Sequence, residues 1–312
     1  MITAFPNGVS SFGIPCMGPL PYFPNKNGLV LFVDGANGLD GNDGKSPETA
    51  KKTIQAAVDL AGSGRGDVIY VFPKGANAGY AETVTIARGD NNITLIGVGP
   101  RGSVFIDPST EDAGGMVVRG NDVTLINMGV AAEDDTSGNI ALLVTGARFR
   151  AYGCKIEGGD EQVRIGPTTV ALGAASGVET GADAIFYDCE IAWGAKGIVI
   201  NRTDYGAVTQ LHVNRCRFHN LTAAHMDERN GTGGQADTCY RNLEIVDCFS
   251  DDSEGGTAPT NYFLLNDNNG NDGIVTRCSF PTAINSGLNL VSTALHWVCN
   301  YHTGGVSTGQ PS

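Results

Sequence analysis

The sequence predicts an all-β protein that folds as a right-handed parallel β-helix, a solenoid in which short strands stack coil upon coil. A six-residue pattern with a central cysteine returns along the chain at intervals of 27 to 35 residues. Glycine accounts for 44 of the 312 residues, whereas long helical patterns are scarce. The repeats are rich in Val, Ile, Phe and Tyr and are separated by Gly, Asn and Asp clusters, as in short strands joined by turns.

The repeated pattern defines one equivalent position per repeat, here named the ladder position. Five segments (AYGCKI, FYDCEI, VNRCRF, IVDCFS and VTRCSF) place a cysteine there, namely Cys154, Cys189, Cys216, Cys248 and Cys278. Two earlier segments fit the same frame, with Met128 in LINMGV and Val98 in LIGVGP. A mean spacing of about 30 residues indicates stacked supersecondary units, because leucine-rich repeats are shorter and propeller blades are longer.

Equivalent positions in stacked coils form columns of like side chains about 4.8 Å apart. The ladder position is therefore predicted to be an interior column, in which reduced thiols act as small apolar fillers rather than as disulfides. Apolar residues three positions earlier predict a second column, formed by Leu95, Leu125, Ala151, Phe186, Val213, Ile245 and Val275. Apolar residues two positions later predict a third, formed by Val130, Ile156, Ile191, Phe218 and Phe280.

Charged residues on both sides of the ladder position alternate in sign. The residues immediately before it are Asp188, Arg215, Asp247 and Arg277. The residues immediately after it include Lys155, Glu190 and Arg217. The alternation predicts two outward ion ladders, in which each exposed pair contributes about 0–1 kcal/mol and mainly fixes the register of the coils.

The segment before the repeats predicts a helix and two strands. Ser46-Pro47 is a helix start, and the apolar spacing of Ile54, Ala57, Val58 and Ala61 predicts a helix over about residues 49–62. Strands are expected at Asp67–Phe72 and Ala81–Ile86. An open β-helix end exposes unpaired strand edges, so this helix is predicted to cap the N-terminal end.

The same segment carries a family resemblance. Its runs FVDGANGLDGNDGKSPETAKKTIQAAVDLA, GDVIYVFPKG and YAETVTI resemble the N-terminal part of pectate-lyase-like β-helix proteins. The match covers about residues 30–100 by motif and continues to about residue 285 by repeat. The run FPNGVSSFGIP (Phe5–Pro15) resembles the short leader of tailed-phage virion proteins that carry this β-helix. The resemblance implies a homotrimeric structural protein located in the virion, on the head or the tail, and assembled in the host cytoplasm.

The chain is expected to divide into three parts. Residues 1–28 are predicted to be an arm that docks on phage capsid or tail proteins, or alternatively wraps its own β-helix. Its apolar anchors, spaced by Pro and Gly, are Phe5, Phe12, Ile14, Tyr22 and Phe23. Residues 29–285 form the β-helix, and residues 286–312 form a closing segment with a flexible tail.

Composition argues against several classes of function. The formal net charge of −13 disfavours nucleic-acid binding. The sequence contains no apolar stretch of about 18 residues, no secretory signal and no CxxC pair, so no membrane span or zinc site is predicted. The oxygen-rich loops Asp34–Gly44 and Asn266–Gly273 miss the EF-hand spacing and are interpreted as turns. No metal or cofactor is expected.

These observations favour a non-catalytic bacteriophage virion protein, such as a head decoration, vertex or spike component attached through its N-terminal arm. The alternative is a tailspike that binds and cleaves host surface polysaccharide, and a third possibility is a glycan-binding module without turnover. Glycoside hydrolysis requires two carboxylates about 5–9.5 Å apart. Asp188 and Asp247 are the candidate pair, although Arg215 stands between them in the stack. A lyase would use Arg202 and Asp204, and Trp193 and Trp297 are expected to pack in the core.

Overall fold

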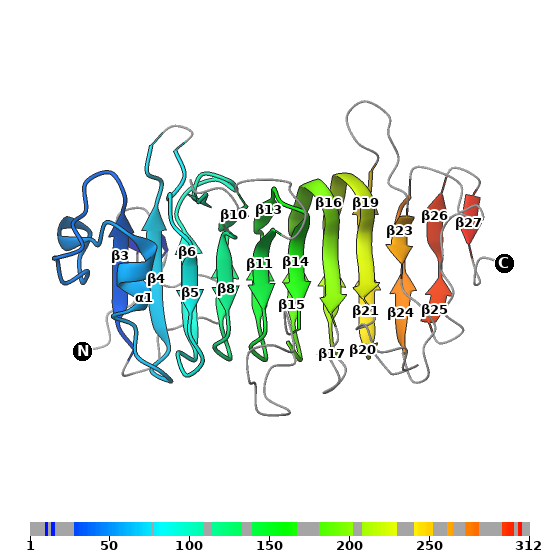
Figure 1. Cartoon of the computed structure of the whole chain (residues 1–312), viewed down its shortest axis with the longest axis horizontal. Helices are drawn as coiled ribbons and strands as arrows, with labels where there is room; N and C mark the ends of the chain where they lie inside the picture. The colour runs from blue at the N-terminus through cyan, green and yellow to red at the C-terminus, as the bar shows by residue number, and fades with distance from the viewer. Residues whose placement is uncertain are drawn as a thin grey trace.

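The chain folds as the predicted right-handed parallel β-helix (Figure 1). The computed structural model describes residues 10–11, 14–15, 28–75, 78–108, 114–132, 139–166, 181–201, 208–229, 240–251, 261–264, 272–280, 295–302 and 305–307. Successive strands lie side by side along the long axis of the molecule, and all strand pairs within the two large sheets are parallel. Among the described residues, no helix has the length and hydropathy needed to cross a membrane.

The first large sheet, here named sheet I, stacks one short strand from each coil. Its ten strands are β3 (Val30–Asp34), β4 (Asp67–Phe72), β6 (Ile93–Gly97), β9 (Thr124–Ile126), β12 (Arg150–Tyr152), β15 (Ile185–Tyr187), β18 (His212–Asn214), β21 (Leu243–Val246), β24 (Gly273–Thr276) and β25 (Leu295–Val298). The last strand, β25, pairs in parallel with β24 and so continues the sheet beyond the predicted boundary at about residue 285.

The second large sheet, sheet II, has eleven strands, of which the two longest bend from one part of the coil into the next. Its strands are β5 (Val84–Ile86), β7 (Phe105–Ile106), β8 (Met116–Val118), β10 (Gly129–Ala131), β11 (Ile140–Val144), β13 (Lys155–Glu157), β14 (Glu161–Ile165), β16 (Glu190–Asn201), β19 (Arg217–Arg229), β22 (Phe249–Ser250) and β23 (Asn261–Leu264). Three small two-stranded pairs complete the described strands: β1 (Ser10–Ser11) with β2 (Ile14–Pro15), β17 (Val208–Thr209) with β20 (Tyr240–Arg241), and β26 (Asn300–His302) with β27 (Gly305–Ser307).

The core fills the interior between the sheets with columns of apolar side chains. Leu125 pairs with Ala151, Ala151 with Phe186, and Phe186 with Val213 in successive coils of sheet I. On sheet II, Val130 pairs with Ile156 and Ile156 with Ile191. All these side chains are fully buried. Such columns form because residues of one parity face inward in every parallel strand.

Each coil turns from sheet I into sheet II at a corner with a left-handed residue. The residue immediately before the ladder position has positive φ in most coils: 53° at Asn127, 54° at Asp188, 55° at Arg215, 53° at Asp247 and 54° at Arg277. Its backbone N–H donates to a carbonyl of the next coil, for example Asp188 N to Asn214 O at 2.9 Å. The corner therefore repeats with the same hydrogen bonds from coil to coil.

Two residues differ from the predicted ladder. Val104, not Val98, occupies the ladder position of its coil, because the next residue, Phe105, pairs with Gly129. The glycine-rich run between them forms a turn that moves Val98 to a half-buried position. At the other end, Trp297 pairs with Val275, which places Asn300 at the ladder position of one coil beyond the predicted ladder.

The predicted helix over residues 49–62 is shorter than expected. A 3-10 turn, η1, spans Pro47–Thr49, and the helix α1 spans Ile54–Val58. Between them the chain is extended, because Lys51 pairs with β3 and its N–H donates to Phe32 O at 2.9 Å. The Glu82 carboxylate accepts from the N–H groups of Ile54 and Gln55 at the start of α1. The buried face of α1 packs on β3, β4 and β5, and its capping role stays a prediction.

Candidate functional site

The outer face of sheet II carries the most varied chemistry among the described residues. Residues one and three positions after the ladder position point outward, because the residue between them is buried, as in the pattern of Lys155, Ile156 and Glu157. We name this surface the outer strip. It consists of Phe105, Asp107, Gly129, Ala131, Lys155, Glu157, Glu190, Ala192, Arg217, His219, Phe249 and Asp251.

A cavity of about 590 Å³ lies at the N-terminal end of the outer strip. Its lining includes Phe105, Asp107, Ala131 and Glu157. The pairing of Ile106 with Val130 and of Val130 with Ile156 places Asp107, Ala131 and Glu157 at equivalent positions of three successive coils. The two carboxylates therefore stand two strand spacings apart, about 10 Å between backbones, with only the Ala131 methyl group between them.

A buried tyrosine fixes one wall of this cavity. Tyr80 is 2% exposed, and its hydroxyl donates to Phe72 O at 2.6 Å and accepts from Gly35 N–H at 2.9 Å. Its backbone bonds to the next coil on both sides, since Tyr80 N donates to Phe105 O and Asp107 N donates to Tyr80 O. Burial raises the pKa of the Tyr80 phenol, so this side chain stays neutral and serves as an anchor.

A lysine joins the aromatic and acidic groups of the cavity. The Lys155 Nζ lies 2.6 Å from Glu157 Oε2 and 5.4 Å from the centroid of the Phe105 ring. Both charged side chains are about one quarter exposed. The contact of an ammonium group with an aromatic face is attractive, so Lys155 holds the Phe105 ring and the Glu157 carboxylate together.

A second polar group lies further along the outer strip. Glu190 Oε1 is 3.2 Å from His219 Nε2, and the His219 ring meets the Trp193 ring edge-on, with centroids 6.2 Å apart. Trp193 is 47% exposed and has a left-handed backbone, with φ of 60°. The expectation that Trp193 packs in the core is therefore wrong, because its left-handed backbone within β16 leaves the indole at the surface. Arg217 and Asp251 pair at 3.2 Å beside Phe249, which is 46% exposed.

The structure places the predicted ion ladder residues at the corner, away from the cavity. Asp247 and Arg277 of adjacent coils form an ion pair at 2.6 Å, and the Arg277 hydrogen bond lowers the pKa of the Asp247 carboxyl. Asp188 instead pairs with Arg101 at 2.7 Å. The Arg215 guanidinium lies 5.7 Å from the Tyr187 ring centroid.

The second predicted ladder has the expected register but different partners. Lys155 pairs in sequence register with Glu190, and Glu190 with Arg217. Their ion pairs nevertheless form with outward residues three positions after a ladder position. Lys155 pairs with Glu157, Glu190 with His219, and Arg217 with Asp251. Asp188 and Asp247 do not line the cavity, and Arg202 and Asp204 lie outside the described residues. Of the predicted arm anchors, Ile14 lies in β2, and Phe5, Phe12, Tyr22 and Phe23 lie outside the described residues.

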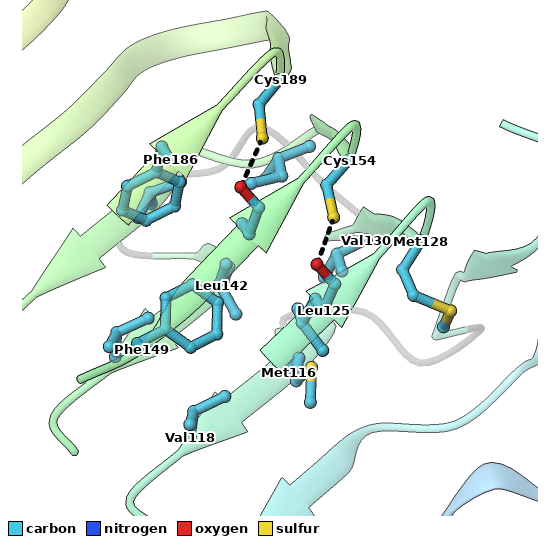
Figure 2. Close-up of a cluster of buried hydrophobic side chains, with 14 of the residues drawn as sticks. Met116, Val118, Leu125, Met128, Val130, Leu142, Phe149, Cys154, Phe186 and Cys189 are labelled. Atoms are coloured by element: carbon cyan, nitrogen blue, oxygen red, sulfur yellow. Dashed lines mark hydrogen bonds between the residues drawn. The ribbon is translucent and has the colours of Figure 1, made fainter. Parts of the chain in front are cut away.

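The ladder cysteines are buried, and each thiol donates to the preceding coil, as Figure 2 shows for Cys154 and Cys189. Cys154 Sγ lies 3.6 Å from Leu125 O, and Cys189 Sγ lies 3.5 Å from Ala151 O. Cys216, Cys248 and Cys278 repeat this contact with Phe186 O, Val213 O and Ile245 O. Met128 precedes Cys154 in the same line. Burial raises the pKa of the Cys154 thiol, so this thiol stays protonated and acts as a hydrogen-bond donor.

The acids of the loop after β3 hold turns together. Asp34 accepts from the Asn37 side-chain amide and from the N–H groups of Asn37 and Ala36, and these bonds together outweigh the effect of burial and lower the pKa of its carboxyl. Asp40 accepts from the N–H groups of Lys52 and Thr53. Within the described part of the chain, no three metal-ligating side chains gather at one point.

The fold class is that of the pectin-lyase-like parallel β-helix proteins. No protein family and no curated protein matches this sequence. Similar solved structures include the pectin methylesterase of Aspergillus niger, with 16% identity, a TM-score of 0.53, and coverage of 89% of this chain and 84% of that chain. A rhamnogalacturonan lyase has 14% identity and a TM-score of 0.56 over 81% of this chain and 68% of its own. Pectate lyase Pel9A has 11% identity and a TM-score of 0.54 over 91% and 78%.

Reasoning from the sequence missed the residues that line the cavity. Asp107 and Glu157 are three positions after Val104 and Cys154, so the repeat frame contained the signal. The repeat constrains the inward positions strongly and the outward ones weakly, and with Val98 at the ladder position Asp107 falls outside the repeat frame.

Proposed function

We propose that this chain is a surface protein of a bacteriophage particle that binds host polysaccharide along the outer strip of sheet II. The observation that carries the binding is the cavity that Phe105, Asp107 and Glu157 line together. Aromatic faces pack on the C–H groups of sugar rings, and carboxylates accept hydrogen bonds from sugar hydroxyls. A concave site with an apolar surface and a few converging polar groups suits such a ligand.

Two further observations support the proposal. The fold neighbours named above are a methylesterase and a lyase of pectin-type polymers and a rhamnogalacturonan lyase, which indicates that this fold accommodates polysaccharides. The resemblance of Phe5–Pro15 to tailed-phage leaders supports the phage assignment. In this proposal the stacked coils supply a rigid rod, attached to the head or tail through residues 1–28, and binding requires no turnover.

Cleavage of the bound glycan is a second candidate, favoured by the spacing of Asp107 and Glu157. Inverting glycosidases hold their two carboxyl groups about 6.5–9.5 Å apart, with room for a water molecule between them. A backbone separation of about 10 Å across Ala131 allows such a distance between the carboxyl groups, because both side chains can lean toward the small Ala131 side chain between them. In that case one carboxylic acid protonates the leaving oxygen and the other carboxylate activates water.

Calorimetric titration with oligosaccharides from host capsule or lipopolysaccharide tests the binding. We expect Phe105→Ala to weaken binding at least tenfold, because it removes the aromatic face of the cavity. Leu60→Ala is the matched control, since Leu60 is an exposed apolar residue outside the outer strip, at 41% exposure. Unchanged affinity in Phe105→Ala, or no affinity of the wild type for any host glycan, would contradict the proposal.

A reducing-end assay on the same oligosaccharides separates cleavage from binding. If the chain is a hydrolase, Asp107→Asn and Glu157→Gln abolish the release of reducing ends while binding persists. If the wild type binds without releasing reducing ends, the chain is a binding protein without turnover, and the second candidate is rejected.

A further inference from the structure

The charged groups of the cavity on the outer strip do not balance one another. Its lining contains two acidic residues, Asp107 and Glu157, and no basic residue. The Glu157 carboxylate is neutralised by Lys155, whose Nζ lies 2.6 Å from Glu157 Oε2. Within the described part of the chain, no basic side chain pairs with Asp107, which is exposed. The cavity therefore offers one uncompensated carboxylate to a ligand.

The other basic residues next to the cavity bind elsewhere. Lys74 and Arg101 adjoin lining residues in the sequence, and Lys74 Nζ donates to Gly79 O at 3.2 Å. Arg101 reaches the corner of a later coil, where its Nη2 lies 2.7 Å from Asp188 Oδ2. The chain as a whole has a formal net charge of −13, so its remaining charges do not supply the missing positive charge.

The uncompensated carboxylate lies beside the aromatic residue of the cavity. Phe105 and Asp107 are two positions apart on the outward side of the strand, so their backbones are separated by about 7 Å. Gly79 allows the neighbouring loop to lie against Asp107, because a Cβ at Gly79 would come within 2.4 Å of the Asp107 Cβ. A sugar ring that contacts Phe105 therefore has Asp107 within reach of one of its substituents.

We propose that this cavity selects glycans with a free amino group and rejects glycans of uronic acids, and that Asp107 makes the distinction. The inference rests on the polysaccharide binding proposed above. A sugar ammonium group donates a charge-assisted hydrogen bond to the Asp107 carboxylate, and no lining residue competes with it. A uronate carboxylate meets like charge and finds no basic partner in the lining, which opposes its binding.

Lys155 sets the strength of this selection. Its ammonium group compensates Glu157 and lies 5.4 Å from the centroid of the Phe105 ring. Loss of Lys155 would leave both carboxylates uncompensated, whereas loss of the Asp107 charge would leave none. The structure therefore predicts opposite changes in selectivity from these two substitutions, and a change in the shape of the cavity alone would not produce opposite signs.

Calorimetric titration of the full-length chain with three tetrasaccharides tests the proposal: chitosan tetrasaccharide, its fully N-acetylated counterpart and tetragalacturonate. At about pH 6 the sugar amine is protonated, as amines beside electron-withdrawing groups are below about pH 8. We expect the wild type to bind the free-amine form at least about tenfold more tightly than either of the others. This preference should fall severalfold between about 50 mM and about 500 mM NaCl, because salt screens the charges.

Two variants and a matched control locate the selection. The measured quantity is the ratio of the affinities for the free-amine and N-acetylated tetrasaccharides. Asp107→Asn should bring this ratio below about threefold, and Lys155→Met should raise it at least about threefold above the wild-type value. Glu48→Gln removes the same charge as Asp107→Asn from an exposed position in η1, outside the outer strip, and should keep the wild-type ratio. Circular dichroism reports whether each variant folds.

The outcomes separate this inference from the proposed function. A wild type without preference for the free-amine tetrasaccharide, or with no affinity for it, overturns the selectivity. An unchanged ratio in the folded variants overturns the role of Asp107. If host oligosaccharides still bind and Phe105→Ala weakens their binding, the proposed function stands without the selectivity. If the wild type binds no glycan at all, both are rejected.

Discussion

At the scale of single residues, the corner before the ladder position decides which side chains a coil accepts. A left-handed backbone costs a non-glycine residue about 1 kcal/mol, and polar side chains reduce this cost when they bond locally. Asn127 bonds to the preceding coil instead, where its Nδ2 donates to Gly97 O at 3.0 Å and to Gly99 O at 2.7 Å. The strain is balanced by the backbone hydrogen bonds that the corner repeats in every coil.

Asn300 shows what the ladder position requires. Its side chain is fully buried, accepts from Cys278 N–H at 2.9 Å and donates to Val275 O at 2.9 Å. The thiols donate to the equivalent carbonyl of the preceding coil, as Cys278 does to Ile245 O. From Cys154 to Asn300 the ladder position therefore holds a small buried donor, whereas Val104 and Met128 fill it in the earlier coils without one. Cysteine supplies the donor with little desolvation.

The ladder predicts unequal effects of two similar substitutions. Cys216 is 1% exposed and lies between Cys189 and Cys248, so Cys216→Ala should lower the free energy of unfolding by about 1–2 kcal/mol through the small void that it leaves. Cys299 is exposed, and Cys299→Ala should change the free energy of unfolding by less than about 0.5 kcal/mol. Urea unfolding measures both values, and equal values would contradict an interior role for the line.

At the scale of elements, the strand β19 brings a titratable ring into the core. His225 is fully buried and stacks on Phe218, with ring centroids 5.7 Å apart and planes 11° from parallel. Burial, with a smaller effect of the nearby His219, lowers the pKa of His225 to about 3. The folded state therefore resists protonation of a side chain that the unfolded state protonates near pH 6.5.

This strand makes stability depend on pH in a defined direction. The pKa of His225 is lower in the folded state than in the unfolded state. The stabilisation of the fold by neutral His225 is therefore complete above pH 6.5 and is lost as the pH falls from 6.5 toward 3. Between pH 7 and pH 5 the loss is about 2 kcal/mol. His225→Gln should remove that part of the pH dependence in urea unfolding, whereas the control His296→Gln, at an exposed position, should not. The same pH dependence in all three proteins would disprove this effect.

At the scale of the whole molecule, the architecture could be predicted because stacking constrains inward positions in every coil. The column of Leu125, Ala151 and Phe186 reads directly from the repeat, since each member contacts the next. Outward positions such as Asp107 and Glu157 have no such constraint, so their grouping required coordinates. Val98 is misplaced because a glycine-rich turn breaks the period. Asn300 lies beyond Cys278, where the predicted ladder ends, because no cysteine pattern marks its coil.

The ladder cysteines also serve as built-in probes of the order in which the coils unfold. Coils contact only their neighbours, so opening should progress along the axis rather than everywhere at once. Fraying from the C-terminal tip would release thiols in the order Cys278, Cys248, Cys216, Cys189 and Cys154. Pulsed alkylation in subdenaturing urea, followed by peptide mass spectrometry, would measure the order in which the five cysteines become labelled. Simultaneous labelling of all five would instead identify the stack as one indivisible cooperative unit.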